Sequence, residues 1–418
     1  NADWNSSIGK VLIYNTVNII LSIQVLSEGD RSIDGLLESF EEYESDIYEL
    51  LLSLLILLCS KSESSANTMP STPLSIIQSV IAKACSYIPE EILFEQTCFN
   101  ELCSVLNSNN SDVQIITCNL LLRITKNMIQ SQSLKVETKG LDGNEAIPDS
   151  LISIASKTPK TYDSEFKFID NDVDSHKILG YLLSYVIILE HFNDATFELK
   201  SVYTTQFRQQ NNLLNNFMLL ICNVLNIGKN DQVFDISNWN VDEFDIETFE
   251  PNDISICVLS AHLYWKALKS ISSLVRNWWN ELKNRQLSIA IEQYTKKYIT
   301  PLLVANEMNS VINTDRSQYE NLVIKANKSR NEIIAQYVIP SEESCIDIII
   351  RIPQDYPLKQ VHIDGGQRAG VQESRWRSWI LSSSAVMVAQ NGNIMDSVLV
   401  FYNNVKLHFE GVEECTIW

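Results

Sequence analysis

The chain has 418 residues, of which 45% are hydrophobic, so it is long enough to fold into two or three compact units. Its formal net charge of -20 argues against a general binder of nucleic acid or of anionic membranes, because phosphate contacts need clustered Lys and Arg. The nine cysteines are scattered among apolar residues and odd in number, which predicts reduced thiols in a cytosolic or nuclear protein.

The most apolar runs, residues 50–59 and 178–189, are shorter than the roughly 20 residues that a membrane-spanning helix requires. They predict buried helices. The chain begins Asn-Ala-Asp-Trp, without a basic region, an apolar stretch or an initiator Met. This start predicts a fragment of a longer protein with neither a signal peptide nor its natural N-terminus.

Apolar residues recur at spacings of three and four along the first two thirds of the chain, the pattern of amphipathic helices. One such face lies within 40–58, and its first turn is acidic. Ser111-Asp112-Val113-Gln114 can form a capping box that starts a helix reaching Met128. Similar periodic stretches lie near 11–26, 74–85, 90–106, 176–191, 207–227, 254–283 and 286–299.

This succession of helices predicts an all-α solenoid over residues 1–299. The start at Asp112-Val113, followed by Arg123, resembles the second helix of a HEAT repeat, although no period of about 40 residues repeats cleanly. Solenoids of the HEAT and armadillo type stack helices pairwise and expose long surfaces, so their usual work is to hold partners or to space other domains apart. No catalysis is implied by this part of the chain.

Four polar stretches interrupt the helices, at 60–73, 131–149, 157–174 and 228–253. The last one alternates acidic and aromatic residues and contains a single base, Lys229. It can be a docking segment for a basic partner, or a strap that packs its aromatic rings on the solenoid and leaves its acids in solvent. We favour the strap. Its aromatic residues are Phe234, Trp239, Phe244 and Phe249.

The pattern changes after Asn313. Four stretches read as strands of an antiparallel meander, with a turn at 327–329 and one face that is apolar throughout. Two helices follow, separated by Asn391-Gly392-Asn393, where Asn or Gly can adopt the left-handed conformation. The last third is therefore predicted to be an α+β unit. The strands are expected at 321–326, 331–338, 344–352 and 359–364, and the helices at 372–390 and 394–409.

Ile352-Pro353 followed by Tyr356-Pro357-Leu358-Lys359 resembles the Tyr-Pro turn of an RWD domain, a relative of ubiquitin-conjugating enzymes that lacks their catalytic cysteine. The family's second proline, expected near Val361, is absent. Four segments within 254–417 are similar to the listerin family of E3 ubiquitin ligases, and residues 408–415 are similar to its junction with the RING domain. The segments are 262–279, 297–303, 370–379 and 408–415.

The resemblance implies a HEAT/ARM-like region at 1–299, an RWD domain with a four-stranded antiparallel sheet and flanking helices at 300–412, and the start of a truncated RING at 413–418. It implies the non-catalytic arm of a RING-type E3 ubiquitin transferase in ribosome-associated quality control. The arm would dock on stalled 60S subunits, near the exit tunnel, and aim the RING at the nascent chain.

The implied partners are ribosomal proteins and rRNA, a ubiquitin-conjugating enzyme bound through the RING, and a nascent-chain quality-control factor, with no membrane. The implied location is the cytosol, on ribosomes. The alternative is a non-catalytic helical-repeat and RWD scaffold for protein interactions, without ligase activity in any form.

The sequence predicts no catalytic residue within this chain. Its five histidines are isolated, and Gly365-Gly366 is not followed by the pattern of a phosphate-binding loop. By resemblance, Cys415 is the first zinc ligand of the RING, but Trp418 stands where a Cys-x-x-Cys pair needs its second thiol. One thiol cannot build a structural zinc site, so we expect zinc only in the missing RING and no ligase activity from the fragment alone.

The best local basic cluster consists of Lys359, Arg368, Arg375 and Arg377, near Trp376 and Trp379. On a helix, Arg375 shares a face with Trp379, whereas Trp376 lines up with Ile380 and faces inward. The cluster can contact ribosomal RNA or protein, or it can be a solvated face over a tryptophan-rich core. The resemblance favours the ribosome. Tyr356, in the neighbouring turn, is a further candidate contact or simply closes the sheet.

Overall fold

The computed structural model divides the chain into two compact units, Asn1–Val224 with Glu243–Leu263, and Leu225–Asp242 with Tyr264–Trp418. Each unit is described by itself. The residues whose structure is described are 6–27, 38, 40–60, 72–95, 98–141, 143, 145–160, 167–169, 172–210, 212–229, 233–315, 317–339, 344–389 and 391–413.

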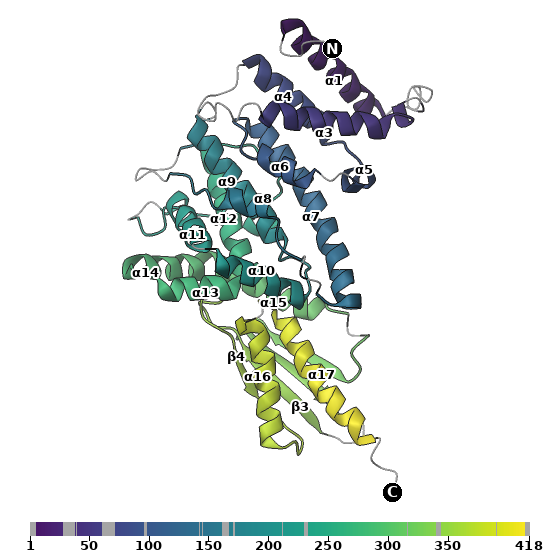
Figure 1. Ribbon diagram of the computed structural model, residues 1–418. Helices are drawn as coiled ribbons and strands as arrows, with labels where there is room; N and C mark the ends of the chain where they lie inside the picture. The colour runs from purple at the N-terminus through teal and green to yellow at the C-terminus, as the bar shows by residue number, and fades with distance from the viewer. Residues whose placement is uncertain are drawn as a thin grey trace. The chain divides into compact units, whose positions relative to one another are not determined.

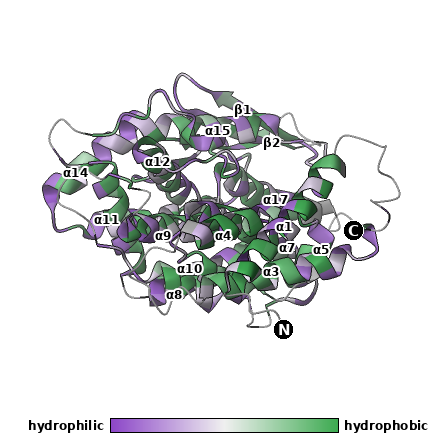
Figure 2. Cartoon of the chain, turned by 90° about the horizontal axis from the view of Figure 1, so that it is seen from above, coloured by the Kyte–Doolittle hydropathy of each residue, from purple (hydrophilic) through white to green (hydrophobic). Residues whose placement is uncertain are grey.

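The first unit is built of helices, which pack in neighbouring pairs such as α1 with α4 and α7 with α9 (Figure 1). This arrangement confirms the predicted helical-repeat class. Hydrophobic residues run along α3 and α4 (Figure 2). The helices are α1 (Ser7–Ser27), α3 (Glu44–Ser60), α4 (Thr72–Cys85), α5 (Glu90–Glu95), α6 (Phe99–Val105), α7 (Ser111–Lys139), α8 (Asp149–Ala155), α9 (Val173–Glu190), α10 (Phe197–Gln209), α11 (Leu213–Val224) and the first part of α12 (Asp253–Ser270).

The core of this unit centres on α9, whose side chains from Ser175 to Glu190 are buried except that of Lys177. The prediction that residues 178–189 form a buried helix is therefore confirmed. Tyr185 stacks on Phe217 of α11 with ring centroids 3.9 Å apart. Gly180 allows the helix to approach α6 closely, because a Cβ atom there would lie 2.2 Å from the carbonyl oxygen of Leu106.

The cap of α7 differs from the predicted one. Asn110, and not Ser111, precedes the first helical residue, and its side-chain Oδ1 accepts a hydrogen bond from the Val113 amide at 3.4 Å. Gln114 does not reach back to close a capping box. Its buried Nε2 donates instead to the carbonyl oxygens of Leu106 and His176, which ties α7 to α6 and α9.

Several helix limits also differ from the periodic stretches. The predicted stretch 90–106 is two helices, and 254–283 is divided at Ile271 into α12 and α13. The stretch 207–227 contains the end of α10, a turn at Asn212 with a positive φ of 63°, and α11. Apolar spacing continues across these breaks because the helices on either side bury neighbouring faces of the same core.

The first helix has an unusual balance of exposure and hydropathy. Among the described residues, the segment Ser7–Leu26 is long and apolar enough to cross a membrane, and 17% of that window is buried. Ile8 and Ile19 are 83% and 62% exposed. Helices in the cores of soluble proteins and signal sequences meet the same criterion, so length and composition alone do not assign this segment to a membrane.

The second unit combines helices with a four-stranded antiparallel sheet of order β1-β2-β3-β4, as predicted. The helices α16 and α17 lie together on one face of the sheet (Figure 1). The elements are the remainder of α12, α13 (Ser272–Glu281), α14 (Arg285–Tyr294), the π-helical turn η4 (Thr295–Ile299), α15 (Thr300–Asn313), β1 (Leu322–Asn327), β2 (Glu332–Val338), β3 (Cys345–Arg351), β4 (His362–Gly365), α16 (Glu373–Ala389) and α17 (Ile394–Glu413).

The strands follow the predicted alternation. Ile346, Ile348 and Ile350 of β3 are fully buried, and their partners on β2 point to the same covered face. Trp376 of α16 lies against the end of β4, where a Cβ atom on Gly365 would come within 2.4 Å of the indole nitrogen. Gly365 therefore makes room for a tryptophan. The turn before α17 uses Asn391 at a φ of 53°.

Candidate docking surface

The Tyr356–Pro357 turn rests on two helices of its own unit through buried hydrogen bonds. Tyr356 is 6% exposed, and its hydroxyl donates to Oε1 of Glu307 at 2.9 Å. Thr300 Oγ1 donates to the Tyr356 carbonyl oxygen at 2.6 Å, and Arg276 Nε donates to that of Pro357 at 3.1 Å. These bonds join the turn, whose Tyr356–Pro357 peptide is cis, to α13 and α15.

Glu307 links three elements. Its second oxygen, Oε2, accepts the amide of Ile394 at 2.9 Å, at the first residue of α17, where the helix dipole favours a carboxylate. Burial raises the pKa of Glu307 above its ordinary value of 4.5, and the two hydrogen bonds oppose that rise. Burial likewise raises the pKa of Tyr356 well above 10, with the Glu307 charge adding to the effect.

Tyr356 is thus enclosed rather than presented to a partner. Its surroundings support the alternative interpretation, in which the turn closes the sheet. Sequence reasoning missed Glu307, Thr300 and Arg276, which hold the turn. In the sequence, Glu307 is an acid among the apolar positions of an amphipathic helix, and Arg276 stands close to a Trp-Trp pair. Both positions are unusual for charged residues, but neither indicates its partner.

The four basic candidates belong to two separate groups. Lys359 is exposed, and its Nζ contacts Asp355 four residues earlier and, at 3.7 Å, Glu292 of α14. It lies beyond the Arg351 end of β3. The loop that carries Arg368 is bound at the other end of that strand, where Asp347 accepts the Gln367 amide through Oδ1 at 2.5 Å. Lys359 therefore lies apart from the three arginines, because the length of β3 separates it from them, and its role as a contact stays a prediction.

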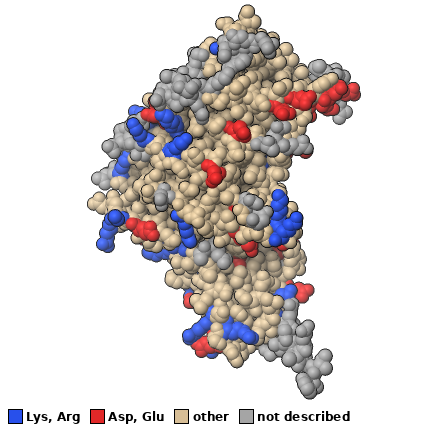
Figure 3. Space-filling model, viewed as in Figure 1, with Lys and Arg blue, Asp and Glu red and all other residues tan. Residues whose placement is uncertain are grey.

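The three arginines lie near the start of α16, two of them beside one carboxylate and the third beside α17. Arg368 lies 3.8 Å from Glu373, and Arg377 contacts the other oxygen of the same carboxylate. Arg375 Nη1 lies 2.8 Å from Nδ1 of His408, whose pKa is lowered by burial and by the arginine charge. Basic side chains with an acidic one among them are visible on the face over α16 (Figure 3). We call Arg368, Arg375 and Arg377 the arginine surface.

A tryptophan-rich core supports this surface. Trp376 and Trp379 are 5% and 6% exposed, and their rings meet edge to face. The predicted inward position of Trp376 is confirmed. Trp379 packs edge-on against His408, which also contacts Arg375, so Arg375 and Trp379 do lie on the same side of α16. The arginine surface thus has a rigid apolar base and a net positive charge, since one carboxylate serves two of its guanidinium groups.

The acidic and aromatic stretch packs much as the strap interpretation predicts. In the first unit, Phe249 is buried, and Phe244 stacks on His262 with centroids 4.9 Å apart. Most of the acids there are exposed. In the second unit, the buried side chains are Ile236 and Val241, whereas Trp239 is 45% exposed. Trp239 is therefore the aromatic residue that departs from the prediction.

Cys415 and Trp418 lie outside the described residues, so the predicted start of a RING at 413–418 stays a prediction. Within the described part of the chain, no group of three or more His, Cys, Asp or Glu side chains could hold a metal ion. The predicted domain limits likewise remain predictions.

Comparisons with known proteins agree with this architecture. Residues 92–312, more than half of the chain, match the family model described as the LTN1 family HEAT repeat region. Residues 322–408 match the model described as ubiquitin conjugating domain-like. The second match covers the four strands, α16 and most of α17.

Relatives named E3 ubiquitin-protein ligase listerin align with most of the chain. The protein of Xenopus tropicalis is 25% identical over 92% of this chain and 24% of its own length, and that of Saccharomyces cerevisiae is 26% identical over 75% and 21%. The protein of Schizosaccharomyces pombe is 31% identical over 58% and 15%. The chain spans no more than a quarter of any of these relatives. It belongs to the LTN1 family, the listerin family of E3 ubiquitin-protein ligases.

Proposed function

We propose that this chain is the positioning arm of a RING-type E3 ubiquitin ligase that docks on stalled 60S ribosomal subunits. Its helical repeats and its RWD-type domain hold the RING near a stalled nascent chain. The arginine surface on the tryptophan core carries the docking part of the proposal. Guanidinium groups suit phosphates and planar bases, and a rigid base keeps them in place.

The mechanism is proximity. A RING with its two zinc ions binds a ubiquitin-conjugating enzyme, and an arm fixed on the ribosome raises the effective concentration of that enzyme at substrate lysines. The chain supplies geometry rather than acid or base groups. In the ubiquitin-conjugating-like region the one cysteine, Cys345, lies on strand β3 opposite Val338, which suits a structural role. The location is then cytosolic, on ribosomes, with a nascent-chain quality-control factor as a further partner.

Charge reversal of the arginine surface tests ribosome docking. The triple variant Arg368→Glu, Arg375→Glu and Arg377→Glu should lose at least tenfold in affinity for purified 60S subunits, measured by co-sedimentation at fixed salt. The matched control reverses three exposed lysines on α7 and should bind normally: Lys126→Glu, Lys135→Glu and Lys139→Glu. Undiminished binding by the arginine variant would refute docking through this surface.

The second candidate is a scaffold for protein interactions without ligase activity. The exposed helical surfaces of the first unit support a scaffold as much as they support a ligase arm, because helical repeats of this kind commonly hold partner proteins. The two differ in the longer protein. A ligase arm requires Cys and His at zinc spacing after residue 417, and zinc-dependent transfer of ubiquitin, whereas a scaffold requires neither.

A further inference from the structure

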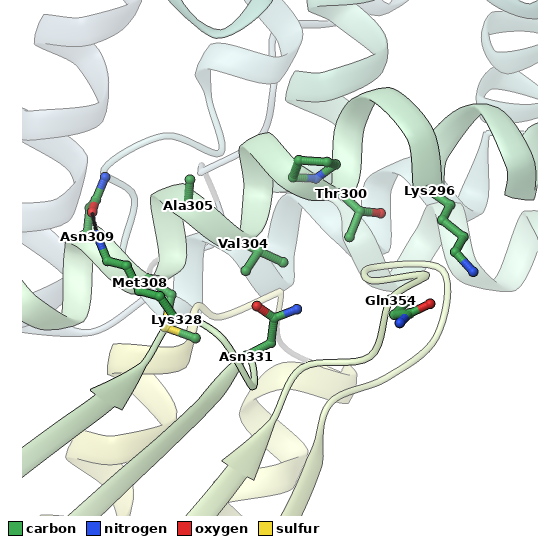
Figure 4. Close-up of a pocket in the computed structure, with 10 residues that line it drawn as sticks. Lys296, Thr300, Val304, Ala305, Met308, Asn309, Lys328, Asn331 and Gln354 are labelled. Atoms are coloured by element: carbon green, nitrogen blue, oxygen red, sulfur yellow. Dashed lines mark hydrogen bonds between the residues drawn. The ribbon is translucent and has the colours of Figure 1, made fainter.

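We propose that a groove along α15 binds a short extended segment of a partner protein that carries an acidic residue near each end. The groove has a volume of about 480 Å³ and lies wholly within the second unit. One side is η4 and α15, and the other is the β1–β2 turn with the loop after β3 (Figure 4). Its lining residues are Lys296, Thr300, Pro301, Val304, Ala305, Met308, Asn309, Lys328, Asn331 and Gln354.

The floor of the groove is largely apolar and consists of small or medium-sized side chains of α15. Thr300, Val304 and Met308 follow one another at four-residue spacing, so they form one stripe of the helix. They are largely buried, whereas Pro301 and Ala305 beside them are exposed. Small exposed apolar residues over a packed stripe leave room for apolar side chains of modest size.

Positive charge stands at both ends of the groove. Lys296 occupies one end, and Lys328 the other, where its Nζ donates to Asn309 Oδ1 at 3.4 Å (Figure 4). None of the ten lining residues is acidic. In a chain with a net charge of -20, this groove therefore attracts anions against the average of the molecule.

The acids next to the lining residues in sequence do not neutralise these lysines, and one of them, Glu307 beside Met308, accepts hydrogen bonds from Tyr356 and Ile394. Asp355 follows Gln354 but contacts Lys359, and Glu332 follows Asn331 but forms an ion pair with Arg351 at 3.0 Å. Carboxylates of a partner thus remain the natural counterions for Lys296 and Lys328.

Amide side chains indicate a polypeptide. Asn309, Asn331 and Gln354 each offer a donor and an acceptor, which matches the alternating groups of an extended main chain. Asn331 points from the β1–β2 turn towards α15 (Figure 4). A nucleic acid is disfavoured because no aromatic side chain lines the groove to stack a base.

The length of the groove sets the length of the segment. From Lys296 to Asn309 the helical backbone advances about 20 Å, at roughly 1.5 Å per residue. An extended chain covers the same distance in about six residues, at roughly 3.3 Å each. The acidic residues of the partner should therefore stand about six positions apart, on either side of small apolar ones.

Fluorescent heptapeptides test the proposal in the absence of ribosomes, so the result is independent of 60S docking. One pool has Glu at both ends and Ala, Val, Leu or Pro at the three central positions, with Ser between. Matched pools have Gln or Lys at the ends. Fluorescence anisotropy should show the Glu-ended pool binding the full chain about tenfold more tightly than the Gln-ended pool, and the Lys-ended pool more weakly still.

Variants of the groove separate specific from general attraction. The pair Lys296→Glu and Lys328→Glu should reverse the preference to Lys-ended peptides, and Ala305→Trp should abolish binding of every pool by filling the floor. The pair Lys126→Glu and Lys135→Glu makes the same charge change on α7 and should alter nothing. Thermal melting confirms that each variant is folded.

Three outcomes would overturn the proposal. The first is that no pool binds at millimolar concentration. The second is that Ala305→Trp leaves binding unchanged, which would place the peptide elsewhere. The third is that a ten-nucleotide oligouridine binds in place of the peptides and is lost in the lysine pair, which would make the groove a nucleic-acid site.

Discussion

At the scale of single residues, the hydrogen bond between Tyr356 and Glu307 should contribute measurably to stability. Tyr356→Phe removes the hydroxyl and leaves a partly buried carboxylate with one fewer donor. A hydrogen bond to a charged group contributes about 2 kcal/mol, so the urea midpoint of the second unit should fall accordingly. Tyr298→Phe is the control, because the hydrogen-bond partners of its hydroxyl, Lys297 and Asp235, are both exposed. Equal losses in the two variants would contradict the assigned role of Tyr356.

The pH dependence of stability should report Glu307. Because its pKa is raised in the folded state, the folded chain binds this proton more tightly than the unfolded chain. Its contribution to the free energy of unfolding is therefore fully present below about pH 4.5 and is lost as the pH rises through the folded pKa. The stability advantage of the native chain over Glu307→Gln should shrink from pH 4.5 to pH 7, measured by urea unfolding. An advantage that grows over this range would show that the pKa is lowered instead.

The sequence predicted local features of this unit well and its hydrogen-bond network poorly. Alternating isoleucines indicate the strands because the pattern needs only neighbouring residues. The partners of Glu307 lie 49 and 87 residues away, and no spacing rule connects an acid with such distant donors. Lys359 and Arg368 are close in sequence, yet β4 and its loops carry them to opposite ends of β3.

At the scale of elements, the strap should stabilise the helical unit through its buried aromatic rings. Phe244→Ser together with Phe249→Ser should lower the free energy of unfolding by about 3 kcal/mol or more, because the stacking on His262 and a buried ring are lost. Trp239→Ser removes an exposed ring and should cost less than about 1 kcal/mol. Thermal melting of the native chain, the double phenylalanine variant and the Trp239 variant measures the difference.

The opposite ranking would favour a docking segment. If the two phenylalanine changes leave the melting temperature unaltered, those rings are not part of the core. The composition of this stretch is compatible with either outcome, since alternation of acids and aromatics does not specify which rings turn inward. In the structure, Ile236, Val241 and Ile246, which lie between the aromatic residues in sequence, are buried. Their burial determines which side chains of the strap face inward.

At the scale of the whole molecule, helix existence was easier to predict than helix limits. The run 178–189 is apolar all round and could only be buried. By contrast, the breaks between helices at Ile271 and Asn212 depend on the direction in which the next helix packs against the core. That direction is not encoded in the local spacing of apolar residues. The cap at Asn110 was missed because Ser111 offers the same chemistry one residue later. Such errors shift boundaries and leave the fold class intact.

The pinned start of α17 has a mechanical consequence. Glu307 fixes the first residue of a 20-residue helix, and Phe409 stacks on Tyr337 near its far end. A helix of this length spans about 30 Å and resists bending. If the predicted RING follows residue 413, α17 sets the distance and the orientation between the sheet and the conjugating enzyme that the RING binds. Each residue inserted into or deleted from α17 would rotate the RING and its bound enzyme by about 100° about the helix axis. The length of α17, rather than any side chain on it, would therefore decide which substrate lysines the enzyme can reach.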